Sequence, residues 1–379
     1  MKRRFPVIGA IGAATILIVV GTFQATGAEV KTVFGSGQPA FADGTGRLAS
    51  FHQPFGICLD SRGNLYVADS ANHCIRRISP DGDVSTFAGS GEKGTVDGPA
   101  HQARFNTPSG VLSDGKGNLY VCSYEENSIR VVSPDGTVRS LVKSREEGYR
   151  DGSLAKARLH SPRGMVFDSK GNLIFSDCWN HRIRKITPEG VVSTLAGGGP
   201  TGEDAAATWR DGTGNEARFF APCGLAIDRN DNLFVADPEN HRIRKITPQG
   251  VVTTIAGSGP GGKAVGGFAD GLAAQSRLNK PTEVAVTADG IVYFSDTYGN
   301  RIRKITPDGV VSTIAGTGEA GFRDGPAEKA QLNWPRGIVL KDNKILFADF
   351  NNNVVRTVPL RDVMLPSTKR AGDYIRKVD

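Results

Sequence analysis

Several features that would reveal an activity are missing from this sequence. Its five cysteines, at positions 58, 74, 122, 178 and 223, are odd in number and share no spacing, which excludes a disulfide framework and a Cys-x-x-Cys metal site. No Gly-x-Ser-x-Gly motif marks a hydrolase nucleophile. Gly-Ser-Gly segments such as 35–37 and 89–91 follow strand-like runs and do not open a helix, so they are not phosphate-binding loops. Motifs alone therefore indicate no reaction.

A strong excess of charge is also missing from the body of the chain. The formal net charge is +7, but the N-terminal basic residues and the basic segment 361–379 supply most of it, so residues 29–360 are close to neutral. A nucleic-acid-binding protein concentrates basic residues on one surface. We therefore expect no nucleic-acid partner.

One long apolar run is present, at the N-terminus. Three basic residues, 2–4, precede an uncharged apolar stretch from Val7 to Phe23 and small residues from Ala25 to Ala28. This order is typical of a cleaved signal peptide, and the stretch is shorter than the roughly 20 apolar residues that a membrane-spanning helix needs. We expect residues 1–28 to be a signal peptide and the protein to be secreted or periplasmic. Membrane association is expected only if this segment is retained as an anchor.

An internal repeat organises the rest of the chain. A proline that begins a strand-like run recurs every 54 to 60 residues, at Pro54, Pro108, Pro162, Pro222, Pro281 and Pro335. In the third repeat, turn residues separate four strand-like runs at 164–168, 172–177, 182–186 and 191–195. Four short strands joined by hairpins form an antiparallel meander.

Six such units predict an all-β fold, a six-bladed β-propeller of four-stranded antiparallel blades, over residues 29–360. Repeat six lacks its fourth strand, and the missing copy stands at the N-terminal end, at residues 30–34. We expect this segment to be the outermost strand of the sixth sheet, beside residues 354–358, closing the ring and removing an exposed edge. Val30, Thr32 and Phe34 should then face one neighbouring blade, and Lys31 and Val33 the other. Residues 361–379 form a basic C-terminal tail, and we expect a monomer.

These repeats resemble the NHL repeat. The loop dipeptides 72–73, 180–181 and 240–241 are each Asn-His, and the second-strand segment 63–69 also matches that family's pattern. The second repeat departs most, because residues 123–128 lack the Asp and the His. The resemblance implies the propeller fold over about residues 29–360. It implies no single activity, because similar proteins include bacterial sensor ectodomains, RNA- or protein-binding scaffolds and a peptide-cleaving lyase.

Histidines raise the question of a metal site. His73, His181 and His241 share one repeat position, which rotation about the axis holds apart, and we expect them to stabilise turns. His52 and His160 share another position near the channel mouth, and together with Glu283 they are an alternative metal-ligand set. Asparagines take that position in three other blades, which favours a shared hydrogen-bonding role. We therefore expect no metal and no cofactor.

Departures from the repeat are the best guide to a ligand site, because a scaffold repeats and a ligand generally does not. The varying residues expected at the channel-mouth face are Arg163, Cys223, Glu283, Trp334, Arg336, Tyr124 and Trp179. Arginines, a carboxylate and aromatic rings together suit an anionic or sugar-like group. The sequence favours an exported, non-catalytic binding or scaffold module for a peptide, glycan or protein ligand. The alternative is a metal-assisted lyase or hydrolase with its site at the channel mouth.

The cysteines divide into two groups. Cys178 and Cys223 should lie on the channel-mouth face in adjacent blades, which makes them a candidate disulfide if their Cα atoms lie within about 7 Å. Cys58 and Cys122 fall within strands and should be small buried apolar residues.

Overall fold

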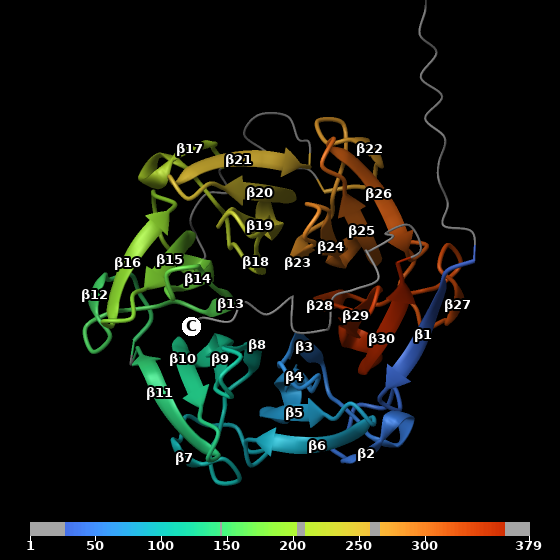
Figure 1. Cartoon of the computed structure of the whole chain (residues 1–379), viewed down its shortest axis with the longest axis horizontal. Helices are drawn as coiled ribbons and strands as arrows, with labels where there is room; N and C mark the ends of the chain where they lie inside the picture. The colour runs from blue at the N-terminus through green and yellow to red at the C-terminus, as the bar shows by residue number, and fades with distance from the viewer. Residues whose placement is uncertain (1–26, 145, 203–208, 258–265, 361–379) are drawn as a thin grey trace, which may run out of the picture.

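Six antiparallel sheets stand around a central axis in the computed structural model of this chain (Figure 1). The structure describes residues 27–144, 146–202, 209–257 and 266–360. The expected signal peptide, apart from its last two residues, and the expected C-terminal tail lie outside the described residues. The six-bladed propeller predicted from the repeats is confirmed.

In each blade the first, second and third strands of the repeat lie in chain order from the axis outward. The innermost strands are β3 (Pro54–Leu59), β8 (Pro108–Ser113), β13 (Pro162–Phe167), β18 (Leu225–Ile227), β23 (Pro281–Val286) and β28 (Pro335–Lys341). The second strands are β4 (Leu65–Asp69), β9 (Leu119–Ser123), β14 (Leu173–Asp177), β19 (Leu233–Asp237), β24 (Val292–Asp296) and β29 (Lys344–Asp349). The third strands are β5 (Cys74–Ile78), β10 (Ser128–Val132), β15 (Arg182–Ile186), β20 (Arg242–Ile246), β25 (Arg301–Ile305) and β30 (Val354–Pro359).

Each sheet has five strands instead of the predicted four. The fourth strands are β6 (Asp83–Ala88), β11 (Thr137–Lys143), β16 (Val191–Ala196), β21 (Val251–Ala256), β26 (Val310–Ala315) and, in blade six, β1 (Glu29–Phe34). The fifth are two-residue strands from the connection that enters each blade: β2 (Gly44–Thr45), β7 (Gly98–Pro99), β12 (Gly152–Ser153), β17 (Gly212–Thr213), β22 (Gly271–Leu272) and β27 (Gly325–Pro326). A two-residue strand has too little pattern to be recognised in the sequence.

Short 3-10 helices complete the blades. Two precede first strands, η1 (Gly46–Leu48) and η5 (Gly214–Glu216). The others join second to third strands: η2 (Ser70–Asn72), η3 (Tyr124–Glu126), η4 (Cys178–Asn180), η6 (Pro238–Asn240), η7 (Thr297–Gly299) and η8 (Phe350–Asn352). None of the helices in the described segments is long and apolar enough to cross a membrane.

The N-terminal strand closes the ring. β1 pairs with β30, with Lys31 opposite Thr357 and Thr32 opposite Arg356, as predicted. It is not the outermost strand, however, because β27 pairs along its free edge. The predicted alternation is also wrong: a bulge between Thr32 and Phe34 interrupts it. Val30 packs between blades five and six, whereas both Val33 and Phe34 pack towards blade one.

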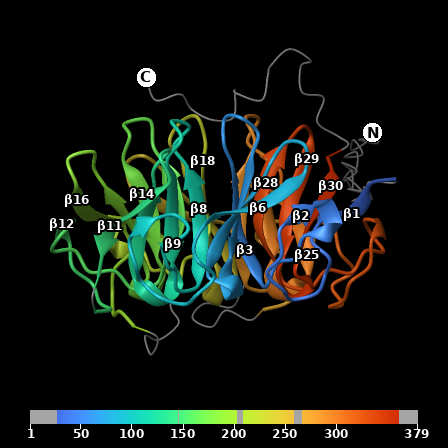
Figure 2. The ribbon, with the colours of Figure 1, turned by 90° about the horizontal axis from the view of Figure 1, so that it is seen from below.

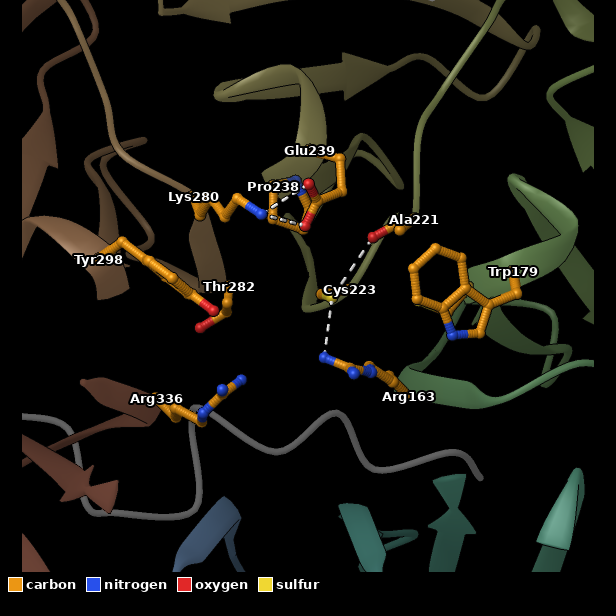
Figure 3. A pocket seen from close by; sticks show the side chains of 11 residues that line it. Arg163, Trp179, Ala221, Cys223, Pro238, Glu239, Lys280, Thr282, Tyr298 and Arg336 are labelled. Carbon is orange, nitrogen blue, oxygen red and sulfur yellow. Dashed lines mark hydrogen bonds and ion pairs between the residues drawn. The ribbon is translucent and has the colours of Figure 1, made fainter. Parts of the chain in front are cut away.

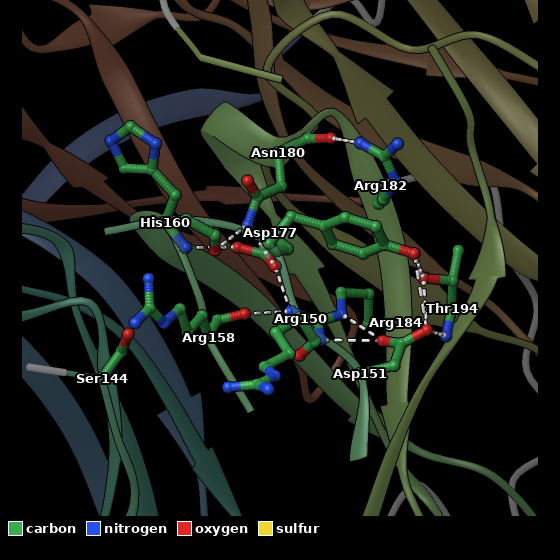
Figure 4. A network of polar contacts seen from close by, with 12 residues as sticks. Ser144, Arg150, Asp151, Arg158, His160, Asp177, Asn180, Arg182, Arg184 and Thr194 are labelled. Carbon is green, nitrogen blue, oxygen red and sulfur yellow. Dashed lines mark hydrogen bonds and ion pairs between the residues drawn. The ribbon is translucent and has the colours of Figure 1, made fainter. Parts of the chain in front are cut away.

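Buried arginines tie each blade to the connection that enters it. In blade three, Arg184 is fully buried and its Nη atoms contact Asp177 at 2.5 Å and Asp151 at 2.8 Å (Figure 4). The third strands of the other five blades carry the equivalent buried arginine: Arg76, Arg130, Arg244, Arg303 and Arg356. Each is paired with carboxylates, so these arginines are structural. They are not a phosphate or nucleic-acid surface.

The histidines of the Asn-His pairs join neighbouring blades. His181 lies in the left-handed region, and its Nδ1 accepts the backbone N–H of Ala221 in the next blade at 3.0 Å. His73 and His241 bind Thr107 and Lys280 in the same way, and asparagine Oδ1 atoms do so in the other three blades. The predicted structural role is confirmed, although each hydrogen bond joins two neighbouring blades and does not stay within one turn.

Close packing at the axis requires glycine. A Cβ atom on Gly110 would lie 1.9 Å from the carbonyl oxygen of Arg163 in the next blade. Blade five has Glu283 at this position, and its side chain extends over Gly224 of blade four, where a Cβ would meet Glu283 Oε1 at 2.1 Å. The first strand of blade four begins only at Leu225, three residues after its proline. The axis is therefore least symmetric between blades four and five.

Candidate functional site

The residue directly after the strand-one proline lines a shared pocket in four of the six blades. In blades three to six these residues are Arg163, Cys223, Thr282 and Arg336, and all four line one pocket of about 110 Å³ (Figure 3). The loops around it complete the lining with Cys178, Trp179, Ala221, Pro238, Glu239, Lys280 and Tyr298. A side chain at this position follows a rigid turn into a strand, so the scaffold fixes where it points.

Arg163 enters the pocket from blade three. Its Nη1 donates to Cys223 Sγ at 3.4 Å, and its guanidinium lies over the rings of Tyr124 at 4.5 Å and Phe55 at 5.3 Å. Burial opposes its charge, but the charged form of the neighbouring Cys223 raises its pKa, so Arg163 stays protonated. Among the described residues no carboxylate pairs with it.

Arg336 enters the same pocket from blade six, on the other side (Figure 3). Only 9% of it is exposed, and aromatic faces hold it, with Phe55 at 4.3 Å and Phe350 at 4.6 Å from the guanidinium carbon. Its Nε has no hydrogen-bond partner in the described chain, and no carboxylate there pairs with it. Burial, and then repulsion by Arg163, lower its pKa to about 10, so it remains a cation at neutral pH.

These two arginines differ from the six structural ones. Arg76 and Arg244 also have a buried Nε without a partner, but their terminal nitrogens contact two aspartates each. Arg336 is the clearer case, because it is almost fully buried, and a buried guanidinium without a carboxylate partner costs several kcal/mol, by order of magnitude. A cation kept in that state at a pocket is ready to receive an anion.

Aromatic side chains form the rim. Trp179 Nε1 donates to the Tyr124 hydroxyl at 2.6 Å, which fixes both rings beside Arg163. Across the mouth, Tyr298 and Trp334 stack with their centroids 4.5 Å apart. Flat rings at a partly open mouth suit the face of a sugar or the side chain of a peptide.

Two thiols form part of the wall. Cys178 and Cys223 pack together with Ala221 and are 1% and 2% exposed. A hydrogen bond from Cys178, and then the charges of Arg163 and Arg336, lower the pKa of Cys223 to about 6 against the effect of burial. Burial raises the pKa of Cys178. The surroundings therefore favour the charged form of Cys223 and the neutral form of Cys178, and both cysteines are free of a disulfide.

The charges of the pocket sum to an excess of positive charge. Lys280 and Glu239 neutralise one another at 2.7 Å on the rim. Glu283 does not line the pocket, and burial raises its pKa to about 8, so it is mostly uncharged at neutral pH. Negative charge on Cys223 offsets at most one of the two guanidinium charges, so the pocket stays positive.

The residues selected from the sequence divide into three groups. Arg163, Cys223, Arg336 and Trp179 line the pocket together, whereas Tyr124 and Trp334 are not among its lining residues but contact Trp179 and Arg336. Glu283 lies among the axis-facing residues next to Gly224. Sequence reasoning missed Thr282, although it occupies the same position after the proline as the arginines, and that shared position was the available signal.

The alternative metal set does not assemble. His160 lies 3.3 Å from Glu147, and the backbone of His52 donates to Asp69 in its own blade. In the part of the chain that the structure describes, no three His, Cys, Asp or Glu side chains are grouped to hold a metal ion. The candidate set of His52, His160 and Glu283 is thus wrong as a cluster, and Glu283 packs over Gly224 instead.

Sequence comparisons match the repeats. A family model for the NHL repeat matches residues 51–78, and one for the teneurin NHL domain matches residues 260–358. Protein SUPPRESSOR OF QUENCHING 1, chloroplastic, of Arabidopsis thaliana is 29% identical over 324 residues, which cover 81% of this chain and 30% of that protein. Human NHL repeat-containing protein 2 is 33% identical over 214 residues, 52% of this chain and 27% of that protein. The chain spans less than a third of the length of these relatives.

Solved structures share the fold at low identity. An auxiliary nutrient binding protein from Bacteroides thetaiotaomicron superposes with a TM-score of 0.66 at 15% identity, covering 87% of this chain and 76% of that chain. Virginiamycin B lyase from Staphylococcus aureus superposes with a TM-score of 0.52 at 14% identity, covering 88% and 99%. Such identities show the fold alone. With six repeats in phase, a closed ring and these sequence matches, the chain belongs to the NHL-repeat β-propeller family.

Proposed function

We propose that this propeller is a non-catalytic binding module that holds an anionic group of a peptide, protein or glycan ligand at its channel mouth. The observation that carries the proposal is the pair Arg163 and Arg336, two guanidinium groups that share a pocket and have no carboxylate partner among the described residues. A planar guanidinium recognises a carboxylate or phosphate through parallel N–H donors.

The size of the pocket limits what enters it. About 110 Å³ accommodates a single anionic group, not a whole sugar or peptide residue with its neighbours. The rest of the ligand would lie over the aromatic rim that Trp179, Tyr298 and Trp334 form. Among fold neighbours, the nutrient-binding protein supports ligand binding in general and the lyase supports catalysis, so the chemistry of the pocket decides our choice.

Ligand titrations test this proposal. Two of the three tryptophans lie at the mouth, so intrinsic fluorescence should report binding. We expect an acetylated dipeptide with a free carboxylate, or a uronic acid, to bind more tightly than its amide or its neutral sugar, and phosphate serves as a third probe. Arg336→Met should weaken binding by about 10- to 100-fold, since a hydrogen bond to a charged group contributes about 1.5–3 kcal/mol.

A charge-neutral double variant on the same rim is the matched control. Lys280→Met with Glu239→Gln removes an ion pair whose charges already cancel, so affinity should change by less than about 3-fold. Equal affinity for the acidic and neutral probes would refute the proposal. Turnover of a ligand that is abolished by Glu283→Gln would replace binding with catalysis.

We also propose that the module acts outside the cytoplasm. This rests on residues 1–28, whose basic start, apolar middle and small-residue end are those of a signal peptide. Protein isolated from the host's envelope should begin near Glu29. An intact Met1 on that protein would argue for a retained anchor.

A further inference from the structure

The pocket contains a pair of cysteines that anion binding does not require. Cys178 is the first residue of η4 in blade three, and Cys223 follows Pro222 in blade four. Although 45 positions separate them in the sequence, their side chains pack together and both line the pocket. The other three cysteines lie within β3, β5 and β9, away from it.

The surroundings make the two sulfur atoms unequal. Cys223 Sγ receives the N–H of Arg163 at 3.4 Å, and Arg336 is a second cation of the same pocket. The hydrogen bond from Cys178, and then these two cations, lower the pKa of Cys223 against the effect of burial, while burial keeps Cys178 a thiol. A thiolate beside a resolving thiol is the arrangement that oxidants convert to a disulfide.

We propose that Cys223 and Cys178 are a peroxide-reactive cysteine pair, in which Cys223 is oxidised first and Cys178 closes the disulfide. The oxidant is a small hydroperoxide, because the sulfur atoms are almost fully buried at the wall of a pocket of about 110 Å³. A molecule of the size of hydrogen peroxide fits that space. A bulky disulfide such as a peptide disulfide does not.

The chemistry balances with the peroxide as the only oxidant. The Cys223 thiolate attacks one peroxide oxygen, the O–O bond breaks, and the leaving alkoxide takes a proton from water to become an alcohol. The sulfenic acid on Cys223 is then attacked by Cys178 sulfur, which forms the S–S bond and releases water. Two electrons pass from the two sulfur atoms to the peroxide. Arg163 is a positioning residue, because it holds the thiolate in place through the 3.4 Å contact.

Thiol counting on the full chain tests the pair. The reduced protein has five cysteines, and a stoichiometric amount of hydrogen peroxide should leave three alkylatable thiols after denaturation. Peptide mapping should find Cys178 linked to Cys223, with Cys58, Cys74 and Cys122 still reduced as internal controls. Cys178→Ser should accumulate a sulfenic acid at Cys223 that a cyclic dione traps, and Cys223→Ser should leave Cys178 unmodified.

Arg163→Met separates positioning from a general loss of structure. Loss of the Arg163 charge should raise the pKa of Cys223, so the thiolate fraction at pH 7 and the oxidation rate should fall, by at most roughly 10- to 30-fold because the Cys178 hydrogen bond and Arg336 remain. The rate should then rise with pH through about 8, whereas the parent rate is flat above about 7. An unchanged melting curve confirms that the variant is folded.

Two results would overturn the proposal. One is five intact thiols after excess peroxide, and the other is oxidation of the strand cysteines at the same rate as Cys223. Neither result touches the anionic-ligand proposal, which the Arg336→Met titration tests on reduced protein. The two ideas can therefore fail independently.

Discussion

Ring closure by the N-terminal strand can be tested with one matched pair of substitutions. Val30 in β1 is 0% exposed and stands opposite Gly325. Val252 in β21 is 1% exposed and stands opposite Gly212, so it occupies the same place in blade four. If β1 is as firmly held as the internal fourth strands, Val30→Ala and Val252→Ala should cost the same free energy of unfolding.

The cost can be worked from what is removed. Each substitution deletes two buried methyl-sized groups, worth about 0.8 kcal/mol apiece by transfer, or roughly 1.6 kcal/mol. The cavity left in a packed core raises this to about 2–3 kcal/mol. Urea unfolding, followed by circular dichroism, should show midpoint shifts of similar size for the two variants. Lys31→Ala, on the exposed face of β1, is the control and should change little.

A zero cost for Val30→Ala beside a normal cost for Val252→Ala would refute closure, because it would mean that β1 detaches before the ring unfolds. Deletion of residues 29–35 is the stronger form of the same test. It should cost several kcal/mol, since it exposes the edge of β30 and removes the strand that carries the buried Val30. Removing 366–379, which lie outside the described residues, should cost little.

Two further predictions concern charge. Burial raises the pKa of Glu283 to about 8 in the folded protein, so the folded state holds a proton that the unfolded state loses near pH 4.5, and the free energy of unfolding should fall as pH rises from 4.5 to 8. In urea titrations at several pH values, Glu283→Gln should remove up to about 4 kcal/mol of that fall, and an unchanged pH dependence would argue against the burial of this carboxyl. The affinity for anions should rise as pH falls through about 6, because protonation of Cys223 removes the negative charge beside Arg163 and Arg336. In fluorescence titrations Cys223→Ser should abolish this rise, and a rise that persists in the variant would come from another titrating group.

Periodic features of the fold could be read from the sequence. A proline recurring every 54 to 60 residues predicted the six blades, and an unmatched copy of the fourth strand at the N-terminal end predicted how the ring closes. Local irregularities could not be read in this way. The bulge after Thr32 and the late start of β18 depend on contacts with neighbouring blades, which no single repeat encodes.

Pocket residues could be predicted where one fixed position of the repeat carries different residues in different blades. Arg163 and Arg336 stand out because other blades have unlike residues directly after the same proline. What could not be foreseen is their lack of carboxylate partners, because the structural arginines look no different in sequence. Glu283 shows that a departure from the repeat does not by itself identify a site residue. It departs as clearly as the arginines, yet its side chain packs over Gly224 and does not line the pocket.

Blade two shows how a departure from the repeat can be compensated, and this can be tested. Ser123 replaces the aspartate that ends the second strand elsewhere, and Glu126, three residues later, takes over its role. Glu126 accepts the backbone N–H of Asn106 and lies 3.7 Å from the buried Arg130, whereas Arg303 and Asp296 in blade five are 2.9 Å apart.

Glu126→Gln should therefore destabilise the protein by about 3 kcal/mol, because it leaves the guanidinium of Arg130 with the half-exposed Asp97 as its single carboxylate partner in the described chain. Ser123→Asp combined with Glu126→Asn transfers the arrangement of blades one, three, four and six, in which an asparagine at the second position donates to the aspartate, as Asn180 does to Asp177 at 2.8 Å. This double variant should recover most of the loss in urea unfolding. If it is no more stable than Glu126→Gln, the carboxylate cannot be moved between the two positions, and the extra length of Glu126 is needed by the backbone of η3 itself.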